Sequence, residues 1–159
     1  MRTAGLALTT ALGLASVACG ATARSADTTF GTPVTVTTAT VTFMTRDDGK
    51  DEDSAVAVQL LDEDGRLAAE ATVANVEFDD RTVSMPLNLA LSRALSSRDI
   101  DDARVRLRLT PDGRDTWMFD MRANLQLSDG TERQYFWSGL QLDESAPERT
   151  MTLASGRMR

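Results

Sequence analysis

The sequence predicts an all-β protein: an antiparallel β-sandwich of about seven or eight strands in one domain. Apolar and polar residues alternate with a period of two in several runs, and short turns rich in Asp and Gly separate these runs. No stretch keeps a helical period for long. Strands with one apolar face need a second layer to bury that face, which favours a sandwich, and a small barrel is the alternative.

Each expected strand follows from such a run. The runs cover residues 39–43, 56–61, 83–91, 105–109, 117–127 and 135–137, with a short closing strand at 151–153. Pro86 suits only an edge strand or a bulge, because proline has no backbone N–H to donate. Trp117 is in register with Phe119 and Met121, so it is expected in the core. Residues 67–71 and 89–95 contain good helix formers and leave a short helix open as an alternative.

The N-terminus reads as a targeting segment. Arg2 precedes an apolar run that is too short to span a bilayer, and the run ends Ser16-Val17-Ala18-Cys19-Gly20. This resembles a bacterial lipoprotein leader, in which the cysteine after the cleavage point is lipidated; simple secretion is the alternative. We therefore expect a leader at 1–19, a flexible tether at 20–33, the β-sandwich at 34–154 and a tail at 155–159. The mature chain is expected outside the cytoplasm, held at a membrane through Cys19.

Composition excludes several kinds of chemistry. The chain has no histidine, and Cys19 is its only cysteine, so Ser-His, Cys-His and multi-cysteine metal sites are excluded. The net charge of −7 argues against binding nucleic acid, because like charge repels a polyanion. A hydrolase that uses paired carboxylates stays open as the less favoured alternative. We therefore expect a protein without enzymatic activity and without catalytic residues.

One loop concentrates negative charge. Residues 47–53 carry five carboxylates in seven positions, and Gly49 gives the backbone room to turn among them. Calcium suits such a loop, because it takes six to eight oxygen ligands in flexible geometry. The spacing is not that of an EF-hand, so a second turn must complete the site, and residues 111–115 supply the best one. The predicted calcium ligands are Asp47, Asp48, Asp51, Asp53, Asp112 and Asp115; a solvated acidic turn is the alternative.

The order of these segments resembles the PLAT, or lipoxygenase-homology, domain over about residues 40–120. The resemblance rests on a strand ending at Thr45, the acidic loop, the strand at 56–58 and Asp115-Thr116-Trp117-Met118-Phe119-Asp120 after the strand at 105–109. It implies a two-sheet β-sandwich that contacts membranes or protein partners, with calcium bound in end loops of some members.

Two other features are candidates for contact with a partner. Tyr135 and Trp137 share one face of a strand that has Phe136 on the other, so this hairpin is the expected partner surface. Arg104, Arg106 and Arg108 form a basic row that suits phosphates or sulfated sugars, although such rows more often pair with carboxylates on neighbouring strands. The expectation is a non-enzymatic interaction module for a protein, lipid or glycan partner, stabilised by calcium or independent of ions.

Overall fold

Antiparallel strands make up most of the folded chain. The computed structural model describes residues 32–112 and 116–156. The predicted leader at 1–19 with Cys19, nearly all of the tether, Asp115 and the last three residues lie outside the described residues. The described elements are β1 (Val36–Thr45), β2 (Ala55–Leu61), β3 (Leu67–Val73), β4 (Leu87–Leu91), β5 (Arg104–Thr110), β6 (Thr116–Leu127), β7 (Glu132–Asp143), β8 (Glu148–Thr152) and α1 (Leu153–Gly156).

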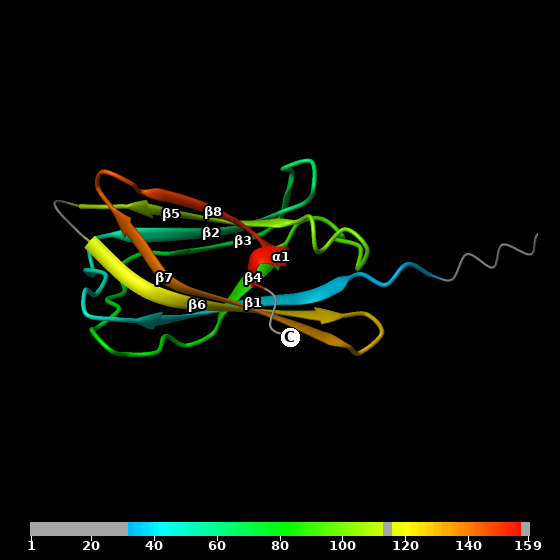
Figure 1. Ribbon diagram of the computed structural model, residues 1–159, viewed down its shortest axis with the longest axis horizontal. Coiled ribbons are helices and arrows are strands. Elements are labelled where there is room, and N and C mark those ends of the chain that lie inside the picture. Colours follow the sequence, from blue (N-terminus) through cyan, green and yellow to red (C-terminus); the bar gives the residue numbers. More distant parts are fainter. Residues whose placement is uncertain (1–31, 113–115, 157–159) are drawn as a thin grey trace, which may run out of the picture. The chain divides into compact units, whose positions relative to one another are not determined.

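The eight strands form one hydrogen-bonded series in the order β7-β6-β1-β4-β3-β2-β5-β8, and every pairing is antiparallel. β4 pairs with β1 on one side and with β3 on the other, so it joins the two halves of the sheet. In Figure 1 the layer of β2, β3, β5 and β8 lies opposite β1 and β6. The sheet is nearly closed, and the all-β antiparallel fold predicted from the sequence is confirmed.

Alternation along the strands builds the core. On β6, every second residue from Trp117 to Leu127 is buried, with exposed fractions of 0–4%. On β5, Val105, Leu107 and Leu109 are buried while the arginines between them face outward. Removing these apolar side chains from water is the main favourable contribution to folding, at about 25 cal/mol per Å² of apolar surface.

An aromatic cluster marks one end of this core. Trp117 stacks on Phe119 with ring centroids 3.9 Å apart, and Phe43 contacts both rings edge-on. The Trp117 indole N–H donates to Thr45 Oγ1 at 3.3 Å, so its polar atom is satisfied inside the core. Phe78 joins the cluster from a loop, 5.3 Å from Trp117. This contact anchors the loop to the core.

Three expectations about elements need correction. Residues 67–71 belong to β3 and pair with β2, which rules out the helix considered for them. The strand expected over 83–91 begins only at Leu87. Before it, Val83 makes a single bridge to Met44, consistent with Pro86 interrupting the ladder. The tail expected from residue 155 is partly ordered, because α1 includes Ser155 and Gly156.

The hairpin expected to be a partner surface contributes to the core instead. Tyr135 is 0% exposed and Trp137 is 7% exposed. The Trp137 indole N–H donates to Ser155 Oγ at 3.1 Å, and α1 contacts both β7 and β8. A Cβ on Gly156 would lie 2.3 Å from Trp137 Cε2, so the absence of a side chain there lets the C-terminal turn cover the indole. Tyr135 and Trp137 therefore hold the fold together rather than presenting themselves to a partner.

Candidate functional site

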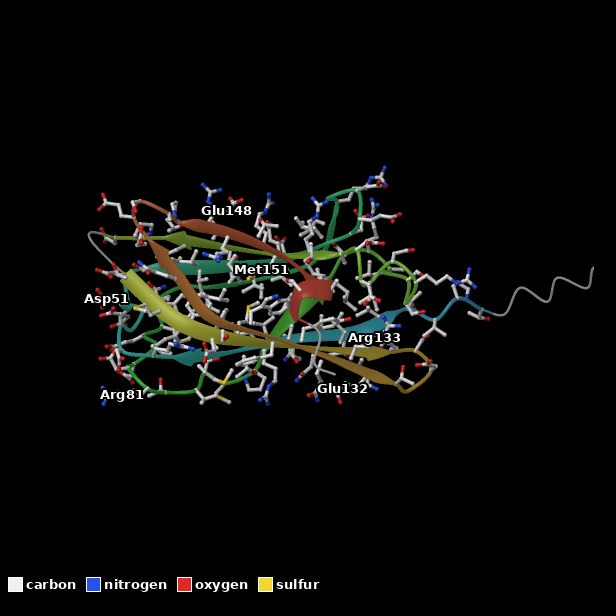
Figure 2. All side chains as sticks on the ribbon, in the orientation of Figure 1. Asp51, Arg81, Glu132, Arg133, Glu148 and Met151 are labelled. Carbon is white, nitrogen blue, oxygen red and sulfur yellow. The ribbon has the colours of Figure 1, made fainter. Side chains whose placement is uncertain are left out.

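Two acidic loops meet at one end of the domain, and we call this region the acidic end. It comprises residues 46–53, between β1 and β2, and residues 74–81, between β3 and β4. Lys50 and Phe78 form an antiparallel bridge across them, with Lys50 N to Phe78 O at 3.1 Å and Phe78 N to Lys50 O at 2.9 Å. Figure 2 shows Asp51 and Arg81 together at this end. The carboxylates of the acidic end are Asp47, Asp48, Asp51, Glu52, Asp53, Glu77, Asp79 and Asp80.

The chain's lysine lies beneath these loops. Lys50 is 0% exposed, although ammonium groups are rarely buried without partners. Its Nζ donates to the carbonyl oxygens of Asp51 at 2.7 Å and of Val76 at 2.6 Å, one from each loop. The same Nζ lies 5.6 Å from the centroid of the Phe78 ring, within the range of a cation–π interaction. Lys50 therefore ties the loops together through their backbones.

Gly49 explains how closely the two loops approach. A Cβ at this position would lie 2.6 Å from Phe78 O and 3.2 Å from Asp80 Oδ1. The first contact is with backbone, which cannot move aside as a flexible side chain can. Glycine is therefore required by packing against residues 78–80, and not only for the turning of the loop expected from the sequence.

Little of the negative charge is neutralised by arginine. Arg81 pairs with Asp47 at 2.9 Å, but both side chains are at least 75% exposed. Arg46 pairs with Asp120 on β6 at 2.7 Å, outside the acidic end. The seven carboxylates other than Asp47 form no ion pair within 4 Å with another residue that the structure describes. The acidic end is thus a concentration of negative charge above one buried cation.

The second predicted turn reaches the same end. β2 and β5 pair Ala55 with Thr110, which brings the turn after β5 against the end of the first acidic loop. The Asp112 N–H donates to Ser54 Oγ at 3.2 Å, and Ser54 is 0% exposed. The start of β6 is also bonded here, through Met118 N to Asp48 O at 3.0 Å. The Asp112 backbone thus lies beside Ser54, whereas Asp115 is not among the described residues.

The acidic side chains of this region lie along open depressions of the surface. Within residues 32–112 and 116–156, no group of three or more acidic side chains is arranged to hold a metal ion. Asp51, Glu52 and Asp53 line one open depression with Asn75, and Asp51 lines a second with Glu77, Asp79 and Asp80. Calcium binding by Asp47, Asp48, Asp51, Asp53, Asp112 and Asp115 therefore stays a prediction, and the set includes one residue outside the description.

Sequence reasoning missed the second acidic loop as part of this region. Asp79-Asp80 reads as an ordinary turn, and Glu77 gives no signal by itself. The useful signal is Phe78, a lone aromatic residue within an acidic turn. A large apolar side chain is more stable when it is removed from water. In the structure Phe78 lies in the core, with 6% of its surface exposed.

Comparisons with known proteins add no assignment to this geometry. No described helix is long and apolar enough to cross a membrane. Neither the protein-family models nor the curated proteins compared with this sequence give a match.

Proposed function

We propose that this chain is a non-enzymatic, extracytoplasmic interaction module, held at a membrane through Cys19, whose acidic end binds a cationic ligand. The supporting observation is the arrangement of charge: Lys50 is buried under two bridged loops, while seven of their eight carboxylates have no ion-pair partner among the described residues. Such like charges repel within the screening length of about 8 Å at physiological salt. A bound cation relieves this repulsion.

Calcium is the first ligand to test. Its preference for several carboxylate and carbonyl oxygens at flexible geometry suits two loops, with Asp112 as a donor from the neighbouring turn. Calcium would fix the loops against one another, so that affinity for a partner depends on calcium. A basic protein segment that pairs directly with the carboxylates is the ion-independent alternative. It is favoured by the finding that no three described carboxylates are arranged as a metal site.

A hydrolytic role has less support. Carboxylate-based hydrolysis needs one carboxylic acid with a raised pKa facing a second carboxylate across the scissile bond. The two depressions at the acidic end are open and are lined mainly by acidic side chains. An open acidic surface favours retention of a cation over protonation of a leaving group.

Thermal melts in calcium, in magnesium and with a chelator test the proposal. A ligand that binds only the folded state stabilises it by about 2.7 kcal/mol when the free ligand concentration is about 100 times the Kd. For a domain of this size, that raises the Tm by several degrees. We expect millimolar calcium to raise the Tm of the protein but not that of an Asp51→Asn/Asp53→Asn variant. The matched control is Glu63→Gln/Asp64→Asn, in a turn that lies outside the acidic end.

The outcomes separate the two versions of the proposal. If calcium leaves the Tm unchanged, the calcium version is wrong. Retention of an Arg- and Lys-rich peptide by the protein, lost in the Asp51→Asn/Asp53→Asn variant, then supports the ion-independent version. If neither calcium nor the peptide binds in a manner that depends on these carboxylates, the acidic end is not a binding site.

A further inference from the structure

A second charged region lies on the outward face of a strand, whereas the acidic end is made of loops. Arg104, Arg106 and Arg108 alternate along β5 with three buried residues, so their side chains project from the same face. We call these three residues the arginine stripe. Successive members are about 6.6 Å apart along the strand, from a rise of about 3.3 Å per residue.

The neighbouring strands place few charged residues opposite the arginine stripe. On the β2 side, its cross-strand neighbours are Leu61, Gln59 and Ala57. On the β8 side they are Thr152, Thr150 and Glu148. Glu148 is the one charged residue of the six; Figure 2 labels it on β8. None of the three arginines forms an ion pair within 4 Å with a described carboxylate, although Glu148 lies opposite Arg108.

The middle arginine is held in a fixed orientation by a neutral group. Arg106 donates from Nε and Nη2 to Gln59 Oε1, at 2.9 and 2.6 Å. Gln59 in turn donates from Nε2 to Glu70 Oε2 at 3.3 Å. Both bonds from Arg106 use one edge of the guanidinium, and its remaining N–H groups are left for a ligand. Guanidinium groups suit sulfate, phosphate and carboxylate, because their N–H groups match two oxygens at once.

We propose that the arginine stripe binds an anionic polysaccharide that lies along β5. A linear chain with repeated anionic groups matches a linear row of cations by charge complementarity. Thr150 and Thr152 lie opposite Arg106 and Arg104 on β8, where their hydroxyls suit the hydroxyls of sugars. This assignment does not depend on the proposed function of the acidic end.

Two other polyanionic partners fit less well. Binding of single-stranded nucleic acid relies on aromatic side chains that stack on bases. Among the residues paired in register with the arginine stripe, none is aromatic or an exposed large apolar residue, so the face lacks both stacking groups and groups that insert into a membrane.

The net charge of −7 does not prevent this binding. Arg108 lies opposite Ala57 on β2, which is four residues from Asp53 of the acidic end, about 13 Å along an extended chain. That exceeds the screening length of about 8 Å at physiological salt, so repulsion from the acidic end is weakened at the arginine stripe. Because the attraction is electrostatic, affinity is expected to fall steeply when salt is raised.

Binding to dextran sulfate, with uncharged dextran as the reference polymer, tests the inference on the full chain. We expect binding to dextran sulfate only, and at least a tenfold loss of affinity in the Arg104→Gln/Arg106→Gln/Arg108→Gln variant. The matched control, Arg66→Gln/Arg93→Gln/Arg122→Gln, removes the same charge elsewhere and is expected to lose less than threefold. The slope of log affinity against log salt should fall in magnitude by about two in the stripe variant.

Three results would overturn the inference. One is an equal loss of affinity in the two triple variants, which would indicate attraction to net charge alone. The others are stripe-dependent binding to phosphatidylglycerol vesicles, or to an oligothymidylate, that is tighter than binding to dextran sulfate. If the triple variant fails to fold by circular dichroism, Arg104→Gln/Arg108→Gln gives the same test while the bonds between Arg106 and Gln59 stay in place.

Discussion

The acidic end and the arginine stripe carry opposite charges and are built in different ways. The arginines face outward because a strand directs alternate side chains to opposite faces, and the buried residues between them fix which face that is. The carboxylates of the acidic end lie on two loops that are far apart in sequence, and these loops are joined through the bridge between Lys50 and Phe78. Local periodicity therefore determines the arginine stripe, whereas one tertiary contact determines the acidic end.

Replacing Lys50 is expected to have the largest effect on the acidic end. Lys50→Met keeps an apolar stem but removes the donor to the carbonyls of Asp51 and Val76. Leaving a buried acceptor without a donor costs about 1–3 kcal/mol, so we expect a loss of about 3 kcal/mol in the free energy of unfolding. Urea denaturation of the variant measures it.

Arg108→Met is the matched control, because it removes a cation from an exposed strand position by the same type of substitution. A change within about 0.5 kcal/mol is expected there, as for surface positions without special contacts. Equal losses in Lys50→Met and Arg108→Met would mean that Lys50 does not hold the acidic end together.

A smaller effect is expected from Gly49→Ala. The added Cβ would lie 2.6 Å from Phe78 O, so the two loops must separate, at a cost of about 1–3 kcal/mol. Hydrogen exchange at the amides of Lys50 and Phe78 should become faster, because each amide bonds across the two loops.

Gly65→Ala provides the contrast. Gly65 has a φ of 78° and no atom within 4 Å of an added Cβ, so its cost arises from backbone strain in its own turn. Exchange at Lys50 and Phe78 should stay unchanged in this variant. Faster exchange in both variants would show that the acidic end opens through general loss of stability.

The smallest effect concerns a carboxylate held within its own turn. The Ser145 hydroxyl, followed by the Ala146 backbone N–H, holds the pKa of Asp143 below its ordinary value of 3.8. A lowered folded-state pKa stabilises the fold above the unfolded value, and this contribution is lost as pH falls through the folded value. Ser145→Ala should therefore raise the pKa of Asp143. An NMR titration of Asp143 measures this change.

The same variant has a pH signature in denaturation. Ser145→Ala should reduce stability slightly at pH 7 and leave it unchanged at a pH below both pKa values. A reduction of equal size at both pH values would indicate lost packing rather than a lost bond to the carboxylate. Such a turn is stabilised by residues next to each other in the chain, unlike the acidic end.

The regular part of the fold could be predicted from the sequence because its cause is local. Alternation placed Trp117, Phe119 and Met121 in the core and the three arginines on the opposite type of face, and the structure agrees. The same rule could not say whether the face with Tyr135 and Trp137 turned inward. Part of the cover over Trp137 comes from α1, whose four residues carry no periodic signal.

The acidic end was less predictable, because a contact between segments distant in sequence builds it. The acidic run at 47–53 is plain in the sequence, and its approach to the turn at Asp112 follows from the pairing of β2 with β5. The burial of Lys50 could not be read in advance, since lysine is among the residues least often buried. Its partners are backbone carbonyls, one of them 26 residues away, which leave no trace in composition.

The contact between Gly156 and Trp137 bears on how the chain reaches its native state. β7 and β8 are the two ends of the strand series, and α1, which touches both, is the last element of the described chain. A chain emerging N-terminus first can pair β6 with β7 early but leaves the indole of Trp137 uncovered until α1 follows. Burial of this indole is thereby coupled to the arrival of a short element that follows β8.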